Sequence, residues 1–370
     1  MKIGIDARMF SKSFTGIGRY NYELTKRLFQ KREDIEWVLF MNEPEFLEFK
    51  APRNVKKVLV NAHHYSLAEQ FRFLNILKKE KCDLIHFTHF NAPILYKGKF
   101  VTTIHDTLIS FYPGKKMNSW WRKLAYNKVI KHTVNDAVRV ITVSDNTKND
   151  VIKLFNIAPQ KITKIWNGIG EEFYEVSDLE KKTVKEKFGL GKDFLLYTGN
   201  WREHKNLVRL LRAFKKVLEK GHSPLQLVIT GKSDPYYPEV LETIKELELQ
   251  DKVKLLGLVS EEDLVRLYNT ASVYVFPSLY EGFGLPPLEA MKCGTPVVAS
   301  HVSAIPEVCG DAVLYFDPEN ILDMAEKINL LLTDSTLQQD LVKKGYEHVK
   351  QFSWEKCASE TLKIYDSVLE

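Results

Sequence analysis

The chain has 370 residues, of which 44% are hydrophobic and 27% are charged, and its formal net charge is +5. This composition is ordinary for a soluble globular protein, and the length exceeds what one hydrophobic core usually supports, so we expect two domains. No apolar run approaches the roughly 20 residues of a membrane-spanning helix and no signal peptide is evident, so a cytoplasmic protein is expected.

The four cysteines are Cys82, Cys293, Cys309 and Cys357. They are scattered, without a C-x-x-C pair or histidine-rich neighbours, which argues against both a disulfide framework and structural zinc.

Basic residues are concentrated in the first half of the chain. Residues 1–170 carry 29 Lys and Arg against 15 Asp and Glu, whereas residues 171–370 carry 24 against 33. A basic half favours an anionic partner, such as nucleic acid, a phospholipid surface or a phosphorylated acceptor. Charge alone does not choose among these partners.

Apolar runs rich in β-branched and aromatic residues alternate with helical patterns along the chain. This alternation predicts right-handed crossovers and mostly parallel sheets. The predicted strands cover residues 2–6, 36–40, 55–60, 83–87, 101–104, 139–143, 162–166, 194–198, 225–230, 253–256, 273–276, 296–299 and 313–316. After the last of them, the pattern is helical to the end of the chain.

The loop after the first predicted strand contains Gly16-Ile17-Gly18, followed by a helical pattern. Arg19, Tyr20 and Asn21 follow, so the stretch does not complete the G-x-G-x-x-G fingerprint of a dinucleotide site. Two glycines at this spacing fit a ligand-bordering loop and an ordinary tight turn equally well.

Polar residues follow two of the predicted strands in the first half. His105 and Asp106 come directly after residues 101–104, and His86 and His89 accompany the strand at 83–87. Ligands of parallel sheets collect at the carboxyl ends of the strands, so these side chains are candidates for a binding site. The alternative is that each histidine is a hydrogen-bonded structural residue.

A helix is predicted within residues 115–136, where Trp120, Trp121 and Leu124 are interleaved with basic residues. A basic aromatic helix of this kind binds anionic bilayers. A core-facing apolar stripe with a solvated basic face explains the same pattern. The basic charge of the whole first half favours membrane contact.

The pattern loosens over residues 171–193, which are rich in Glu, Lys and Gly, and we predict the interdomain connection there. The loop after the next strand holds Arg202 and Lys205. Two cations at a strand-to-helix turn are suited to a pyrophosphate, although they are also ordinary surface charges.

The stretch EGFGLPPLEAMKCGTPVVAS, residues 281–300, carries the most specific pattern. Gly282 and Gly284 follow a buried strand, and two prolines suit the first turn of the next helix. Backbone N–H groups at such a turn bind phosphate, and Glu281 and Glu289 can accept hydrogen bonds from sugar hydroxyls. Alternatively, Glu289 complements the helix dipole and Glu281 is a solvated loop residue.

Residues 278–300 resemble the E-x7-E segment of the retaining glycosyltransferases of family 4, also called group 1 glycosyl transferases. TGIGRY, TTIHDTL and TGNWREHKNL are similar to further segments of that family, so the resemblance covers essentially the whole chain. It implies the α/β GT-B fold, with two Rossmann-like domains facing across a cleft. The domains implied are 1–170 with the returning helix 354–370, a connection at 171–193, and 194–353.

The resemblance also implies roles for residues of the second domain. Glu289 holds the ribose, Glu281 contacts the donor sugar, and Arg202 and Lys205 bind the diphosphate. His204 stands where the family commonly has an Arg before that Lys. The remaining donor-binding positions are Val259, whose segment faces the base, and Gly282, Phe283, Gly284 and Leu285, whose amides reach sugar and phosphate.

In the first domain, the resemblance implies that His105 reaches the donor sugar, with Asp106 beside it. Gly16 and Gly18 then border the cleft opposite the donor phosphates. His89, with His86, is a candidate for the acceptor pocket.

The activity implied is transfer of a sugar from a nucleotide-diphosphate donor to an acceptor hydroxyl, with retention at the anomeric carbon. The pattern is most similar to mannosyltransferases of bacterial surface polysaccharides, so we predict GDP-mannose as donor and a glycan or lipid-linked acceptor, with no nucleic acid partner. The chain has no D-x-D sequence, so neither a catalytic metal nor a cofactor is predicted. Peripheral contact with the inner face of the cytoplasmic membrane is a further expectation.

Three alternatives stay open. The first is a UDP-sugar-dependent glycosyltransferase of the same family. The second is a GT-B sugar-nucleotide epimerase, which needs no second substrate. The third is a non-catalytic module that binds a nucleotide or an anionic surface.

Overall fold

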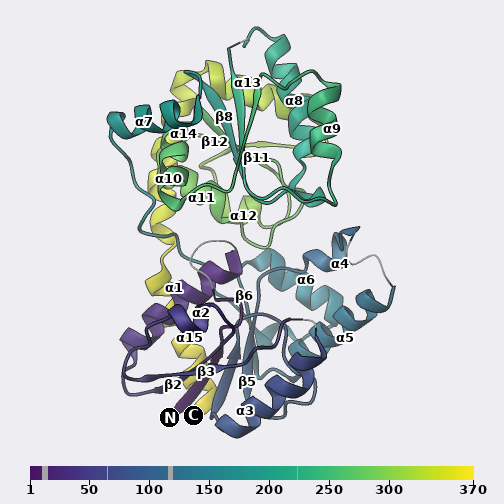
Figure 1. The fold of residues 1–370 in the computed structure, drawn as a ribbon, viewed down its shortest axis with the longest axis vertical. Helices are drawn as coiled ribbons and strands as arrows, with labels where there is room; N and C mark the ends of the chain where they lie inside the picture. The colour runs from purple at the N-terminus through teal and green to yellow at the C-terminus, as the bar shows by residue number, and fades with distance from the viewer. Residues whose placement is uncertain (11–15, 65, 116–119, 223) are drawn as a thin grey trace. The chain divides into compact units, whose positions relative to one another are not determined.

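The computed structural model describes residues 1–10, 16–64, 66–115, 120–222 and 224–370, which form two compact units (Figure 1). Unit 1 comprises Met1–Thr107, Lys116–Gly168 and Phe352–Glu370, and unit 2 comprises Leu108–Lys115 and Ile169–Gln351. Each unit is a parallel sheet with helices packed against it.

The described part of unit 1 contains a seven-stranded sheet in the order β3-β2-β1-β4-β5-β6-β7, and all its neighbouring strands are parallel. Side chains on both faces of the central strands are buried, which explains why these strands appear in the sequence as continuous apolar runs. The strands are β1 (Lys2–Asp6), β2 (Glu36–Met41), β3 (Val55–Leu59), β4 (Leu84–Phe87), β5 (Phe100–Ile104), β6 (Arg139–Thr142) and β7 (Ile162–Lys164).

Helices at the two ends of the chain share one core in unit 1. α1 (Gly16–Lys31) lies beside α15 (Trp354–Leu369), and both bury apolar side chains against β1 and β2 (Figure 1). The predicted return of the terminal helix to the first unit is therefore confirmed. The other helices of unit 1 are α2 (Glu45–Glu48), a π-helical turn (Glu69–Phe73), α3 (Leu74–Glu80), α5 (Trp120–Asp136), α6 (Asp145–Phe155) and a 3-10 turn (Pro159–Lys161).

Unit 2 has a six-stranded parallel sheet within its described residues, in the order β10-β9-β8-β11-β12-β13. Its strands are β8 (Phe194–Thr198), β9 (Gln226–Thr230), β10 (Val253–Gly257), β11 (Val273–Phe276), β12 (Val297–Ser300) and β13 (Leu314–Phe316). The strands observed in both units correspond to the predicted ones, with ends that differ by at most two residues.

Helices α8 (Leu207–Glu219), α9 (Glu239–Glu246) and α13 (Ile321–Thr333) bury their apolar faces against one side of this sheet (Figure 1). The other helices of unit 2 are α4 (Leu108–Phe111), α7 (Asp178–Phe188), α10 (Glu261–Thr270), α11 (Leu285–Lys292), α12 (Ile305–Cys309) and α14 (Ser335–His348), with 3-10 turns at Glu203–Lys205 and Val349–Gln351.

The segment 171–193, predicted as a connection, contains helix α7 and belongs to unit 2. Ser177 and Glu180 form a reciprocal capping box at its first turn, and Gly189 ends it in the left-handed conformation. Only Val184 of this helix is buried. A helix with so small an apolar face has weak periodicity, which explains why its sequence looks like a loop.

Candidate functional site

The strand order of unit 2 reverses between β8 and β11. From β8 the chain proceeds outward through β9 and β10, and from β11 it proceeds in the opposite direction through β12 and β13. Ligands of open parallel sheets bind outside the carboxyl ends of the strands at such a switch point. The loops after β8 and β11 carry the two most specific sequence patterns, so the fold brings them to one edge of the sheet.

Buried hydrogen bonds join these two loops. Asn206 ends the 3-10 turn after β8 in the left-handed conformation, and its side-chain amide donates to the carbonyl oxygens of Pro277 at 3.0 Å and Pro318 at 2.8 Å. The Leu279 amide donates to the carbonyl of His204 at 2.7 Å. The position of the β8 loop is therefore set by the backbone after β11 and after β13.

Lys205 and Glu281 form an ion pair in the space between these loops. The Lys205 Nζ lies 2.5 Å from Glu281 Oε1, and the side chains are only 20% and 15% exposed. Arg202 is exposed three residues earlier. The predicted diphosphate cation and the predicted sugar-binding carboxylate are therefore direct neighbours, although 76 residues separate them in sequence.

His204 contributes no charge to this group. Burial, and then the nearby charges of Lys205 and Arg202, lowers the pKa of His204 to about 2. A neutral imidazole here cannot replace the cation of an arginine at neutral pH. Lys205 and Arg202 are thus the cations of this loop.

The loop after β11 turns directly into helix α11. Gly282 and Phe283 are buried, and Gly284 caps the helix with a φ of 101°, a value that favours glycine. Pro286 occupies one of the first helical positions, where no intrahelical N–H partner is needed. The helix begins at Leu285, so the predicted glycine loop and helix start are as observed.

Glu289 lies in the second turn of α11 and is half-buried. It accepts a hydrogen bond of 2.9 Å from the hydroxyl of Tyr268, a fully buried residue of α10. Val259 follows β10 at the same carboxyl edge of the sheet and is also half-buried. The structure therefore places the predicted donor-binding residues of unit 2 on the loops and the first turns of helix α11 at a single sheet edge.

The candidate residues of unit 1 follow strands near its own switch point, between β1 and β4. His105 follows β5, and its Nε2 lies 2.9 Å from the carbonyl oxygen of Thr88. A carbonyl only accepts, so Nε2 carries the proton and Nδ1 is an acceptor. Burial lowers the pKa of His105 to about 4, so the ring is neutral at physiological pH. Asp106, the next residue, is half-buried.

Gly16 and Gly18 lie in the first turn of α1 rather than in a loop before it. Gly18 is buried and Gly16 is exposed. Thr15, the first residue of the TGIGRY segment, lies outside the described residues. The role predicted for these glycines remains a prediction.

His86 is a correction to the sequence analysis. It lies within β4 and is fully buried, with Nδ1 2.5 Å from the hydroxyl of Tyr365 on α15 and Nε2 2.8 Å from that of Thr103. The strand continues one residue beyond His86, so this residue is part of the sheet and not of the loop after it. Its buried side chain contacts Tyr365 and so contributes to the packing of α15. His89 follows the end of β4 and is half-buried. Its role in an acceptor pocket remains a prediction.

A buried ion cluster next to His89 was not predicted from the sequence. Arg8 pairs with Asp6 at 2.8 Å and with Glu69 at 2.9 Å, and its side chain is fully buried. Burial opposes the charge of Arg8, but the two carboxylates raise its pKa. Asn91 links the cluster to His89 through a 2.5 Å contact with the ring Nδ1. The available signal was Asp6 at the end of the opening strand, with Arg8 two residues later.

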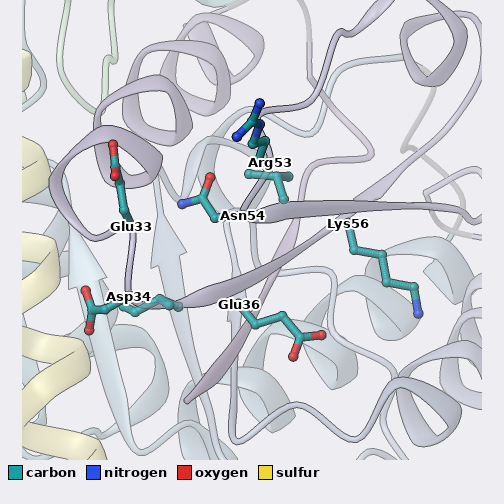
Figure 2. A pocket seen from close by; sticks show the side chains of 8 residues that line it. Glu33, Asp34, Glu36, Arg53, Asn54 and Lys56 are labelled. Atoms are coloured by element: carbon teal, nitrogen blue, oxygen red, sulfur yellow. The ribbon is translucent and has the colours of Figure 1, made fainter.

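The pocket in Figure 2 lies at the other end of the unit 1 sheet. It is lined by Glu33–Glu36 and Arg53–Lys56, which lead into the first residues of β2 and β3. These are the amino ends of parallel strands, whereas ligands collect at the carboxyl ends. The pocket is therefore not part of the candidate site.

Two features are absent from the described residues. No helix among them is both long and apolar enough to span a bilayer. Within the same ranges, no group of three or more His, Cys, Asp or Glu side chains has the arrangement of a metal site.

Sequence comparison then decides the family. Residues 178–348 match the family model described as "Glycosyl transferases group 1", and residues 14–173 match the one described as "Glycosyltransferase Family 4". O-antigen chain mannosyltransferase B of Escherichia coli is 31% identical over 99% of both chains.

The chain belongs to the group 1 glycosyl transferases. It is a glycosyltransferase, as the resemblance in its motifs predicted. A second relative, O-antigen chain mannosyltransferase RfbU of Salmonella typhimurium, is 32% identical over 64% of this chain and 61% of its own.

The fold comparison agrees with this membership. Sucrose-phosphate synthase from Thermosynechococcus elongatus superposes with a TM-score of 0.79 at 21% identity, covering 99% of this chain and 98% of its own. At this identity the likeness concerns the fold alone. The predicted α/β GT-B fold class, with two Rossmann-like units, is confirmed.

Proposed function

We propose that this glycosyltransferase moves a mannosyl group from GDP-mannose to a glycan or lipid-linked acceptor in the synthesis of a cell-surface polysaccharide, with retention at the anomeric carbon. The observation that carries the proposal is the grouping of Lys205, Glu281 and Glu289 at the switch point of unit 2. The mannosyltransferase names of two relatives support the choice of sugar.

The chemistry follows from where charge develops. The bond between the anomeric carbon and the diphosphate oxygen breaks, so the sugar gains oxocarbenium character while negative charge grows on the leaving group. Lys205, Arg202 and the amides at the start of α11 stabilise that negative charge. The acceptor oxygen attacks the same face, and its proton passes to the departing phosphate.

These cations supply the charge that a metal ion provides in other transferases, so we propose that no metal and no other cofactor takes part. His105 has a different task. Its neutral ring offers Nδ1 as a hydrogen-bond acceptor for a sugar hydroxyl, as the Nε2 contact with Thr88 requires.

The donor assignment predicts the outcome of a substrate panel. Hydrolysis of GDP-mannose, UDP-glucose, UDP-galactose and UDP-N-acetylglucosamine is compared, and transfer is assayed with a lipid extract, each with and without EDTA. A misplaced sugar hydroxyl leaves buried polar groups unpaired, at a cost of about 1 to 3 kcal/mol, so GDP-mannose is expected to be preferred by roughly 5- to 150-fold.

The other outcomes separate the alternatives. Preference for a UDP-sugar overturns the mannose assignment and leaves the glycosyltransferase intact. Isomerisation of a donor without acceptor indicates an epimerase, and binding without any turnover indicates a non-catalytic module. Loss of transfer in EDTA that added Mg²⁺ restores overturns the metal-free mechanism.

We also propose that α5 of unit 1 binds an anionic membrane surface, which would hold the enzyme near a lipid-linked acceptor at the inner face of the membrane. Trp120, Trp121 and Leu124 are 75%, 54% and 61% exposed at the start of the helix. Tyr126 and Ile130 are buried, so the predicted aromatic stripe divides into a core-facing part and an exposed part. Lys115 was included in the predicted helix, but it precedes α5 and pairs with Glu239 at 2.8 Å. Residues 116–119 lie outside the described residues.

Vesicle binding tests this surface. Each basic residue near an anionic bilayer contributes about 1 kcal/mol, so changing Lys123, Lys128 and Lys131 to Glu should weaken binding by at least roughly 150-fold. The same charge change at Lys78, Lys79 and Lys81 is the matched control and should have a smaller effect. Binding should also fall at high salt. If the wild-type enzyme ignores phosphatidylserine vesicles at low salt, the surface has another function.

A further inference from the structure

A line of buried hydroxyl groups runs from the core of unit 2 to Glu289. Tyr268 of α10 lies 2.9 Å from Glu289 and 3.0 Å from Thr198 at the end of β8. Thr198 in turn lies 3.0 Å from the hydroxyl of Tyr274 in β11. All three hydroxyl residues are buried. They belong to three different elements, so the line is part of the tertiary packing at the switch point.

The direction of these hydrogen bonds follows from the number of protons. An ionised carboxylate only accepts, so Tyr268 donates its single proton to Glu289. The Tyr268 oxygen must then accept from Thr198, and Thr198 must accept from Tyr274. Each hydroxyl therefore donates towards Glu289, and hydrogen bonds aligned in this way strengthen one another.

The surroundings keep both phenols protonated. Burial, and then the charge of Glu289, raises the pKa of Tyr268 well above its ordinary value. Burial also raises the pKa of Tyr274. The rings of these two tyrosines pack edge to face, with centroids 5.3 Å apart, which restricts the rotation of both.

We infer that Tyr268 is a positioning residue for nucleotide binding: its hydroxyl orients the Glu289 carboxylate towards the ribose hydroxyls of the donor. The inference rests on the proposed function, because it takes Glu289 as the group that binds ribose. A carboxylate held by a buried donor keeps one orientation before the ligand arrives, and binding loses less free energy to ordering.

Tyr268→Phe removes the hydroxyl and keeps the ring. Calorimetry with GDP and UDP identifies the tighter nucleotide, and its 2′,3′-dideoxy analogue is then measured as well. The variant should bind the ribonucleotide roughly five- to tenfold more weakly, about the loss of one hydrogen bond, and the dideoxy analogue as the wild type does. In a Glu289→Gln background, the same change should add little further loss, because the two residues act together.

Two further variants act as controls. Tyr274→Phe makes the same chemical change one step further from Glu289 and leaves the Tyr268 hydrogen bond in place, so its effect should be smaller. Thr198→Val leaves Tyr268 unchanged and removes the hydroxyl that donates to it. This variant should lose less nucleotide affinity than Tyr268→Phe, and again only for the nucleotide that has ribose hydroxyls. Thermal unfolding shows whether each variant is folded.

The outcomes distinguish this inference from the proposed function. Wild-type enzyme that binds neither GDP nor UDP overturns the proposed function and the inference with it. Wild-type enzyme that binds a nucleotide, while Tyr268→Phe binds it equally well or loses the same affinity for the dideoxy analogue, overturns the inference alone.

Discussion

Replacing Lys205 by alanine is expected to lower the turnover of glycosyl transfer by about 10²- to 10³-fold, the size of effect seen when one group that stabilises developing negative charge is removed. Lys205 is the partly buried cation at the switch point of unit 2, and its Nζ lies 2.5 Å from Glu281. The substitution also leaves the Glu281 carboxylate without its cation, so a diphosphate is repelled there. Both consequences reduce turnover, which is measured as kcat with saturating donor and acceptor.

Two comparisons show which consequence dominates. Lys216→Ala removes a solvent-exposed ion pair of 2.9 Å with Glu219 on α8, and it should leave turnover unchanged because such pairs contribute little. The double variant Lys205→Ala with Glu281→Gln removes both charges of the site. If the double variant turns over as fast as Glu281→Gln alone, Lys205 only neutralises Glu281 and does not act on the leaving group.

The architecture was predictable because parallel sheets are covered on both faces. A strand such as β11, with VYVF buried throughout, appears in the sequence as an uninterrupted apolar run between turn residues. Helix α7 was missed for the opposite reason, since Val184 is its only buried residue. Its capping box, Ser177 with Glu180, was nevertheless visible in the sequence.

The residues of the candidate site were predictable as far as they follow strands. His105, Lys205 and Glu281 all lie in segments directly after strands, where ligands of such sheets bind. Their partners were not predictable from local pattern. Tyr268 looks like one more apolar position of an amphipathic helix, and only the folded chain places its hydroxyl 2.9 Å from Glu289.

The long-range ion pairs show the same limit. Arg8 and Glu69 are far apart in sequence and pair in the buried core of unit 1. His86 shows the converse error. Its place near a strand end resembled that of a site residue, but β4 extends past it, and both ring nitrogens are occupied by buried hydroxyl groups.

Replacing the two carboxylates of the E-x7-E segment by alanine should impair different steps, nucleotide binding in one case and turnover in the other. Glu289→Ala is expected to weaken binding of free nucleotide by roughly 10- to 150-fold, because a hydrogen bond to a charged group typically contributes about 1.5 to 3 kcal/mol. Glu281→Ala is expected to lower turnover by a similar factor without weakening nucleotide binding. Calorimetry with the free nucleotide and steady-state kinetics with the intact donor provide the two measurements.

The ion pair at the switch point determines the direction in which Glu281→Ala should change nucleotide affinity. In the wild type, Lys205 donates to Glu281. On the proposed function, a bound diphosphate would share that cation with the carboxylate. Glu281→Ala removes the competing acceptor and a repelling negative charge, so the free nucleotide should bind as tightly as before or more tightly while transfer slows. Equal losses of nucleotide affinity in Glu281→Ala and Glu289→Ala would contradict the division of roles, because they would mean that both carboxylates bind the part of the donor that the free nucleotide retains.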